Sequence, residues 1–428
     1  MPALRLYAMP ALLLLAIHRS PGGHESFFFK NESPDLLISR SNPDESTPQP
    51  QSMSRATPAS VGLASAPIEE ATALLKRSVA ERKIAGAVAA IARHGKVAYF
   101  ESVGVQDLDT RAPMTERSLF RIYSMTKPVT AVAVMMLHES GRFSLTDPVS
   151  KYLPEFKDAR VALPDGTTRP PAREITVQDL LLHTSGLSHR TAEIYRTARV
   201  RVRTDTLPQF VAKITRAPLM EDPGTRFRYS EGTTVLGRLV EIWSGQKFDT
   251  FLDERVFRPL GMTDTGFWVR PDQRDRFTTA YQPVPGGGLA AIEIEPEAPF
   301  TGRPALLEGA VGLVSTVPDY LRFAQMLLNR GELNGVRILG AKTVDMMTVN
   351  SLPDAVLALR GGRRGWGLGN VDVALDTGEY GWDGTAGTIF TIDPRRELIT
   401  VLMWQTVPAD PDRLRARFKA LVDRAIVD

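Results

Sequence analysis

The sequence contains no cysteine, which excludes disulfides, thiolate metal sites and a cysteine nucleophile. It also lacks the H-E-x-x-H motif of zinc hydrolases and the G-x-S-x-G nucleophile elbow of α/β-hydrolases, so it indicates neither class of enzyme. The glycine-rich stretch at 361–369, which we interpret as a turn, does not have the spacing of a phosphate-binding loop. We therefore expect an activity that needs no metal and no cofactor.

The sequence also has little excess of either charge, since its net charge is only +3 over 428 residues. This balance gives no reason to expect nucleic acid or an anionic membrane surface as a partner. The apolar run at 7–17 is too short to cross a bilayer, so we predict no stable membrane span. The sequence does not specify an oligomeric state.

Residues 1–60 differ in composition from the rest of the chain. The apolar run at 7–17 follows Arg5, and a segment rich in Ser, Pro, Asn and Asp extends from there to about residue 60. We expect 1–60 to be either a disordered leader or an over-long N-terminus, with translation starting at Met53. A start at Met53 favours the cytoplasm, whereas a signal peptide within 1–30 favours the periplasm or secretion.

A serine and a lysine lie three residues apart where an apolar helical run begins. Ser124 and Lys127 share one face of that predicted helix, so their hydroxyl and amine can meet. Pro128 is tolerated mainly in the first helical turn, which places Ser124 at the helix N-terminus. There, free N–H groups favour a developing oxyanion, and burial of Lys127 would lower its pKa and make it a base.

The same short pattern occurs a second time, at Ser244 and Lys247. Gly245 reads as a helix C-terminal stop, so these two side chains are predicted to lie past the helix end on no common face. The alternative for Ser124 is a helix cap beside a solvated Lys127. The remaining motifs of the chain decide between these interpretations.

Strand-like runs lie at both ends of the chain and helical patterns lie between them. Two strands joined by a turn at His94 form a predicted hairpin, and the middle of the chain reads as helices and loops, with an irregular loop at 283–304. We predict an α/β (α+β) fold with one antiparallel sheet flanked by helices and a mainly helical second domain. The expected division is 61–144 with 300–428 for the sheet domain, and 145–299 for the helical domain.

Two further stretches carry candidate site residues. Tyr229 lies in a loop between two predicted helices, where a tyrosine is usually a packing residue. Beside a lysine ammonium, however, its phenol would be driven toward phenolate, which is a competent base. Gly384 precedes a predicted strand and allows close approach of a ligand, so an edge N–H there can pair with that of Ser124 as an oxyanion hole.

Three motifs follow one another along the chain: S-x-x-K at Ser124, Y-S-x at Tyr229 and W-x-G at Trp382. In this order they resemble the family VIII esterases, which are serine esterases related to class C β-lactamases and D-Ala-D-Ala carboxypeptidases. The stretches LFRIYSMTKPVTAVAVMMLHESGRFSLTDPVSKYLPEF, ITVQDLLLHTSGL, ERVFRPLGM and GAVGLVSTVPDYLRFAQMLLN support the resemblance, which covers about 65–425. It implies a β-lactamase/penicillin-binding-protein-like fold with the site between a sheet domain and a helical domain.

The resemblance also implies the roles of the site residues. Ser124 would attack an acyl carbonyl, Lys127 and Tyr229 would share the base role, and the N–H groups of Ser124 and Thr385 would form the oxyanion hole. Trp382, in the W-x-G motif with Gly384, stands where β-lactamases carry a lysine, which is typical of the esterase branch.

Two positions depart from the β-lactamase pattern. Glu231 replaces an asparagine, which argues against β-lactam hydrolysis. Asp383 is unusual at its position and has no explanation in the sequence; its charge is expected to repel a substrate carboxylate.

The resulting prediction is a serine carboxylesterase that acts on small, short-chain esters through an acyl-enzyme. The alternatives are a β-lactamase, an acyltransferase or a D-Ala-D-Ala peptidase with the same mechanism, or a catalytically dead binding or scaffold homologue. His183 and His138 are interpreted as structural, because lysine and tyrosine already fill the base role.

Overall fold

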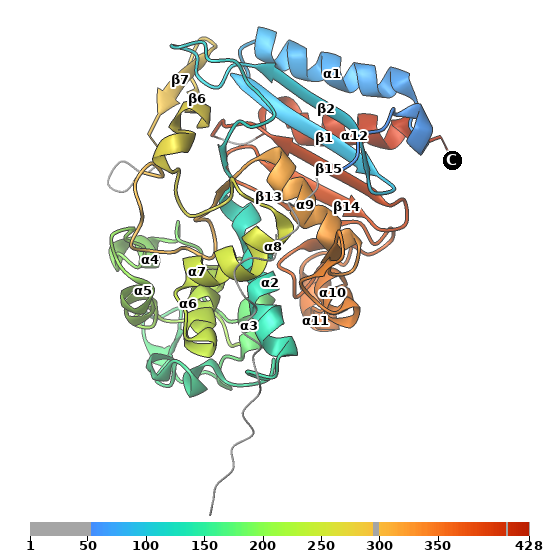
Figure 1. The fold of residues 1–428 in the computed structure, drawn as a ribbon. Helices are drawn as coiled ribbons and strands as arrows, with labels where there is room; N and C mark the ends of the chain where they lie inside the picture. Colours follow the sequence, from blue (N-terminus) through green and yellow to red (C-terminus); the bar gives the residue numbers. More distant parts are fainter. Residues whose placement is uncertain (1–52, 294–298, 408–409, 428) are drawn as a thin grey trace, which may run out of the picture. The chain divides into compact units, whose positions relative to one another are not determined.

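A seven-stranded antiparallel sheet is assembled from both ends of the described chain (Figure 1). The structure is a computed structural model that describes residues 53–293, 299–407 and 410–427. The strand order is β11-β12-β13-β14-β15-β1-β2. The strands are β1 (Gly86–Arg93), β2 (Lys96–Gly104), β11 (Arg364–Trp366), β12 (Asp372–Ala374), β13 (Tyr380–Asp383), β14 (Ile389–Asp393) and β15 (Leu398–Met403). The predicted antiparallel sheet flanked by helices is therefore confirmed.

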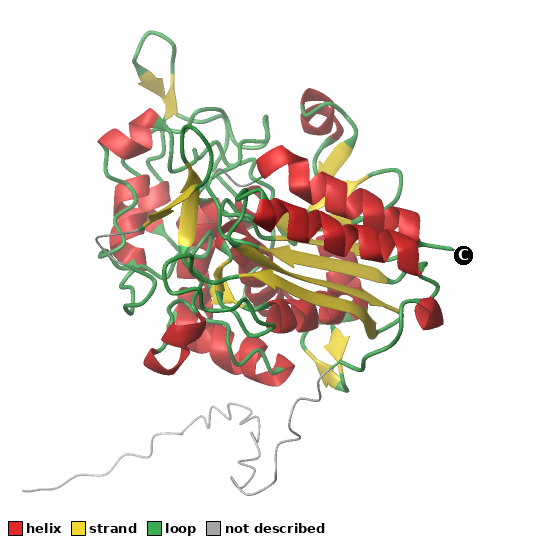
Figure 2. Cartoon of the chain, turned by 90° about the horizontal axis from the view of Figure 1, so that it is seen from above, coloured by secondary structure: helices red, strands yellow, loops and turns green. Residues whose placement is uncertain are grey.

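Both faces of the sheet are buried, as the composition of β1 shows. Every residue of β1 is buried, and its alternate residues enter two different hydrophobic clusters. Ala87, Ala89 and Ile91 pack toward helices α1 (Ser65–Ala80) and α12 (Leu414–Ala425), which lie across the sheet in Figure 2. The opposite face packs on helices α2 (Thr126–Glu139) and α9 (Val317–Leu328). Side chains of alternate residues point to opposite faces of a strand, so an uninterrupted apolar strand is needed here.

The predicted hairpin of β1 and β2 is present, with its turn at His94. His94 and Gly95 lie in the turn with φ of 51° and 73°, and Arg93 pairs with Lys96. Two successive positive φ values define the tight turn that matches strand twist. His94 is a turn residue, as predicted, and its Nδ1 lies 2.9 Å from Glu397 Oε2.

Helices dominate the middle of the chain. They are α3 (Val177–Leu181), α4 (Glu193–Thr197), α5 (Leu207–Ile214), α6 (Gly232–Ser244), α7 (Phe248–Leu252), a π-helical turn η5 (Asp253–Phe257) and α8 (Arg258–Leu260). Two more follow α9, namely α10 (Ala341–Thr348) and α11 (Asp354–Leu359). All described residues belong to one compact unit. The expected division into a sheet domain (61–144 with 300–428) and a helical domain (145–299) therefore stays a prediction.

Short elements connect these parts. The strands are β3 (Phe120–Arg121), β4 (Val161–Ala162), β5 (Thr168–Arg169), β6 (Ala280–Pro283), β7 (Leu289–Ile292), β8 (Val314–Ser315), β9 (Glu332–Leu333) and β10 (Val336–Arg337). The 3₁₀ helices are η1 (Ala59–Val61), η2 (Tyr123–Met125), η3 (Val149–Lys151), η4 (Pro154–Phe156), η6 (Pro271–Arg276) and η7 (Pro411–Arg413). Among the described residues, no helix is both long and apolar enough to cross a membrane.

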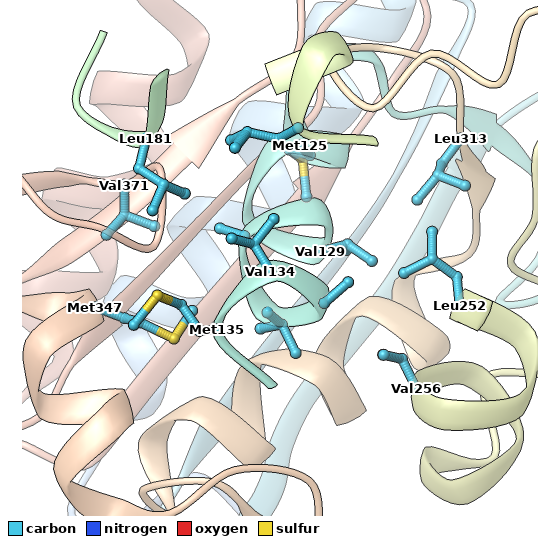
Figure 3. Close-up of a cluster of buried hydrophobic side chains, with 14 of the residues drawn as sticks. Met125, Val129, Val134, Met135, Leu181, Leu252, Val256, Leu313, Met347 and Val371 are labelled. Atoms are coloured by element: carbon cyan, nitrogen blue, oxygen red, sulfur yellow. The ribbon is translucent and has the colours of Figure 1, made fainter. Parts of the chain in front are cut away.

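Helix α2 runs through the main hydrophobic core. Figure 3 shows Val129, Val134 and Met135 of α2 with side chains of other elements on both sides, among them Leu252 and Met347. A helix that is apolar all round must be buried on every side. The element that follows Ser124 is therefore held by packing from the sheet and from the surrounding helices.

Three expectations need correction. The irregular loop expected at 283–304 contains strand β7 and the turn that joins it to β6, because the short apolar run at 289–292 pairs with β6 despite the nearby glycines and prolines. The glycine-rich turn at 361–369 contains the edge strand β11. Residues 53–60, assigned above to the leader, are ordered: Arg55 bridges to Val97, and Met53 packs against the core. The rest of the leader, with the apolar run at 7–17 and any signal peptide within 1–30, lies outside the described residues.

Candidate active site

Ser124 lies in a tight turn between strand β3 and helix α2. Tyr123, directly before it, has a φ of 43°, a left-handed conformation that non-glycine residues rarely adopt. Ser124 then lies in η2, and α2 begins two residues later with Pro128 in its first turn. The predicted position at a helix N-terminus is confirmed. Strained backbone of this kind is found at functional sites when the surrounding structure holds it in place.

Hydrogen bonds from distant segments hold this turn. Ile122 N donates to Leu313 O at 3.0 Å, and Leu313 N donates to Thr126 Oγ1 at 3.1 Å. The Tyr320 hydroxyl of α9 donates to Met125 O at 2.8 Å. Ser124 is 7% exposed, so it is mostly buried but keeps a small solvent-accessible area.

Lys127 is completely buried one helical turn after Ser124. Its Nζ donates to Ala310 O at 3.0 Å and lies 4.5 Å from the centre of the Tyr229 ring. Burial lowers the pKa of Lys127 to about 7; the carboxylate of Glu231 opposes the shift and the guanidinium of Arg190 adds to it. A large share of Lys127 is therefore neutral near pH 7. A neutral amine keeps N–H groups for Ala310 and has a lone pair that can accept a proton.

Tyr229 is half-buried beside Lys127 and Trp382. Trp382 Nε1 donates to the Tyr229 hydroxyl at 3.1 Å. Burial raises the pKa of Tyr229 well above its ordinary value, and the hydrogen bonds with Ser124 and Trp382 only partly oppose that rise. Burial therefore opposes the phenolate expected from the sequence, because desolvation disfavours the charged form of a phenol. A raised pKa favours the neutral phenol, which has a proton to donate.

An aromatic cluster lies next to Tyr229. The Trp382 ring is 5.4 Å from the Tyr229 ring and meets Trp366 edge-on at 4.6 Å and 89°. Trp366 is fully buried, and its Nε1 donates to Leu181 O at 3.1 Å. His189 stacks on Tyr229 at 5.8 Å. Trp366 and His189 could not be recognised from the sequence as neighbours of the site, since neither belongs to a motif with Tyr229.

The turn between β13 and β14 lies against the segment that precedes Ser124. A Cβ on Gly384 would come within 2.4 Å of Ile122 O, so only glycine allows this approach. Thr388 Oγ1 donates to the same carbonyl at 3.2 Å. Thr385 is exposed at the tip of the turn, and within the described chain its N–H donates to no protein acceptor. Gly384 and Thr385 therefore belong to a turn that is attached two residues before Ser124.

Asp383, unexplained in the sequence, has a partner on the C-terminal helix. Its Oδ2 accepts a hydrogen bond from Arg415 Nη1 at 2.6 Å. The guanidinium of Arg415 partly compensates the charge of Asp383, which weakens the repulsion of a substrate carboxylate expected from the sequence.

The residues interpreted as structural lie as expected. His183 is fully buried after α3, and its Nδ1 accepts from Ser230 N at 3.3 Å. His138 Nδ1 lies 3.2 Å from Phe143 O. Ser244 ends α6, Gly245 has a φ of 72°, and the exposed Lys247 lies beyond the helix end. The second S-x-x-K match thus has no shared helical face.

No group of three or more His, Asp or Glu side chains that could hold a metal ion occurs in the part of the chain that the structure describes. The chemistry that this arrangement can support is acyl transfer: a hydroxyl, a buried amine with a lowered pKa and a phenol lie together beside a turn with a free N–H.

Comparison with known proteins agrees with this geometry. The family model described as Beta-lactamase matches residues 71–424. Protein Rv1367c of Mycobacterium tuberculosis is 34% identical over 76% of this chain and 86% of its own, and Esterase EstB of Burkholderia gladioli is 30% identical over 78% and 89%. The solved structure of "EstCE1, a hydrolase with promiscuous acyltransferase activity" has a TM-score of 0.71 and 26% identity, and covers 83% of this chain and 98% of its own. The resemblance predicted from the motifs is confirmed: the chain belongs to the beta-lactamase family of serine hydrolases, whose members include esterases.

Proposed function

We propose that the protein is a carboxylesterase that hydrolyses short-chain esters through an acyl-enzyme on Ser124. The Ser124 oxygen bonds to the ester carbonyl carbon while its proton passes to the neutral amine of Lys127. The carbonyl oxygen becomes an oxyanion, which the N–H groups of Ser124 and Thr385 stabilise. The C–O bond to the alcohol then breaks, and the alcohol leaves with a proton donated by Tyr229 and replaced from the Lys127 ammonium. Water cleaves the acyl-enzyme by the reverse proton route.

The observation that carries this proposal is the complete burial of Lys127 beside Ser124. Burial lowers the pKa of Lys127 to about 7, whereas it raises the pKa of Tyr229. Two neighbouring groups with pKa values driven apart are suited to act as base and acid. This supports Lys127 as the proton acceptor and Tyr229 as the proton donor. A catalytically dead scaffold would have no use for a completely buried lysine in this position.

The aromatic side of the site supports a neutral, apolar substrate. Trp382 is half-buried and packed on Tyr229 and Trp366, so it presents apolar area and no cation next to the nucleophile. A β-lactam or a cell-wall peptide carries a carboxylate, which needs a cation or firm donors. The similarity to Esterase EstB, at 30% identity, supports an ester as the substrate.

A series of p-nitrophenyl esters of rising acyl length, measured beside nitrocefin, tests the proposal. We expect short-chain esters to exceed nitrocefin by at least about a hundredfold in kcat/KM, which is roughly 2.7 kcal/mol in transition-state stabilisation. Ser124→Ala should abolish both activities. Equal efficiency on nitrocefin and p-nitrophenyl butyrate would replace the esterase proposal with a β-lactamase.

Trp382→Lys probes the aromatic contribution separately. It removes apolar area and the Nε1 donor to Tyr229, so ester kcat/KM should fall while active-site labelling of Ser124 persists. A faster ester reaction in this variant would contradict the role of Trp382.

Acyl transfer to an alcohol is the second candidate, and the similarity to EstCE1, a hydrolase with promiscuous acyltransferase activity, favours it. An acceptor alcohol added to the ester assay would divert part of the acyl group into a new ester. Product analysis by chromatography distinguishes the two outcomes, because hydrolysis alone yields only the free acid.

A further inference from the structure

We propose that Arg415 is a positioning residue for the oxyanion hole, acting through the turn between β13 and β14. The inference rests on the proposed function, in which the N–H of Thr385 stabilises the oxyanion. Arg415 lies in α12, on the opposite side of this turn from the Ser124 segment, and belongs to no motif discussed above.

The Arg415 guanidinium contacts three groups of the turn. Nη1 donates to Asp383 Oδ2 at 2.6 Å, and Nη2 donates to Gly384 O at 2.6 Å and to Thr388 O at 3.3 Å. The guanidinium carbon lies 5.6 Å from the centre of the Trp404 ring. The side chain of Arg415 is 12% exposed and that of Asp383 is 46% exposed, so the contacts to the carbonyl oxygens of the buried Gly384 and Thr388 are the better shielded ones. Shielded, charge-assisted hydrogen bonds are the stronger kind.

The contact to Gly384 O acts directly on the proposed oxyanion donor. Gly384 C=O and Thr385 N–H belong to one planar peptide group, and in a trans peptide they point in opposite directions. When Arg415 holds the carbonyl on one side, the N–H is therefore directed to the other side. The positive charge also polarises this peptide group, which makes its N–H a better donor.

The turn is held on its other side by the nucleophile segment. Gly384 approaches Ile122 O so closely that no side chain fits, and Thr388 Oγ1 donates to that oxygen. Thr388 O accepts from Gly384 N at 2.8 Å, which closes the turn. The turn thus lies between Ile122, two residues before Ser124, and Arg415 of α12. Loss of Arg415 frees one side only, which should misdirect the N–H without unfolding the sheet.

Asp383 completes the arrangement by orienting the guanidinium. Its carboxylate accepts from Nη1, which leaves Nη2 directed to the two carbonyl oxygens. Lysine cannot reproduce this, because its ammonium lacks the planar fork that reaches several acceptors at once. This gives Asp383 a role that its position in the sequence does not suggest.

The test uses the full chain and steady-state hydrolysis of p-nitrophenyl butyrate. In Arg415→Ala, kcat should fall about 10- to 100-fold, because losing a whole oxyanion donor costs about 10²–10³. KM should stay within about threefold, since the donor acts mainly in the transition state. Guanidinium chloride at millimolar concentration should restore part of kcat. Arg415→Lys should stay impaired, and Asp383→Asn should lose about three- to tenfold in kcat.

Arg424→Gln is the matched control. Arg424 lies on the same helix, where its Nη2 makes an exposed ion pair with Glu70 Oε1 at 2.9 Å, so kcat should stay unchanged. A folded Arg415→Ala or Arg415→Lys with wild-type kcat would overturn the inference, as would a loss in Arg415→Ala that guanidinium does not restore. Ser124→Ala distinguishes the two proposals: an active Ser124→Ala refutes the proposed function, whereas an inactive one with an unaffected Arg415→Lys refutes only the role of Arg415.

Discussion

Burial drives the pKa values of Lys127 and Tyr229 apart, although the sequence presents both residues as candidate bases. Both lie beside Ser124, but the same desolvation favours the neutral amine of Lys127 and the neutral phenol of Tyr229. In the proposed mechanism the amine is therefore the base and the phenol the acid at neutral pH. Activity should be full above the pKa of Lys127, near 7, and should be lost as the pH falls below it.

Two substitutions should move this acidic limb in opposite directions. The carboxylate of Glu231 raises the pKa of Lys127, so Glu231→Gln should shift the acidic limb of kcat/KM to lower pH. Arg190 lowers the same pKa, so Arg190→Gln should shift the limb to higher pH. The profile of kcat/KM reports groups of the free enzyme, so it is the quantity to measure. Shifts in the same direction for both variants would contradict the assignment of Lys127 as the base.

At the scale of elements, the turn between β13 and β14 depends on a close backbone approach. Gly384→Ala would bring Cβ within 2.2 Å of Thr388 Oγ1 and 2.4 Å of Ile122 O, so the turn must move away. We expect kcat for p-nitrophenyl butyrate to fall at least about tenfold through loss of oxyanion stabilisation. Gly266→Ala is the control, because its Cβ would meet only Trp268 O at 3.9 Å. Equal kcat in the two variants would contradict this role of the turn.

Helix α3 begins with a network centred on one carboxylate. Asp179 accepts from Arg173 Nη1 at 2.6 Å and Nη2 at 2.9 Å, from Thr176 N at 2.9 Å and from Thr184 Oγ1 at 2.9 Å. Burial alone raises the pKa of Asp179, but the hydrogen bonds from Arg173 and Thr176 outweigh it and hold the pKa below its ordinary value. The carboxylate therefore stabilises the fold at neutral pH, and this contribution is lost as the pH falls through the lowered pKa.

Asp179→Ala should lower the free energy of unfolding by about 2–3 kcal/mol at pH 7, because it removes a buried carboxylate and leaves its hydrogen-bond donors without their acceptor. Urea unfolding measures this loss, and the difference from the wild type should shrink in acid. Asp165→Ala, in an exposed turn, should lose clearly less at pH 7. A loss for Asp179→Ala no larger than that of the control would show that the network is not stabilising.

At the scale of the whole molecule, the sheet could be predicted from alternating and apolar strand patterns at both ends of the chain. Local signals also predicted the start of α2, where Pro128 follows Ser124 and Lys127. The partnership of Arg415 with Gly384 could not be predicted, because its residues are 31 positions apart and share no periodicity. The order of the pKa values of Lys127 and Tyr229 depends on burial, which only the packed structure reveals.

The most direct test of the whole account is to identify the acylated residue. The protein is labelled with a fluorophosphonate, digested and analysed by mass spectrometry, beside Ser124→Ala and Ser244→Ala. We predict that the label lies on Ser124, that Ser124→Ala takes up none and loses ester hydrolysis, and that Ser244→Ala retains both. A label on Ser244, or full ester hydrolysis by Ser124→Ala, would contradict it.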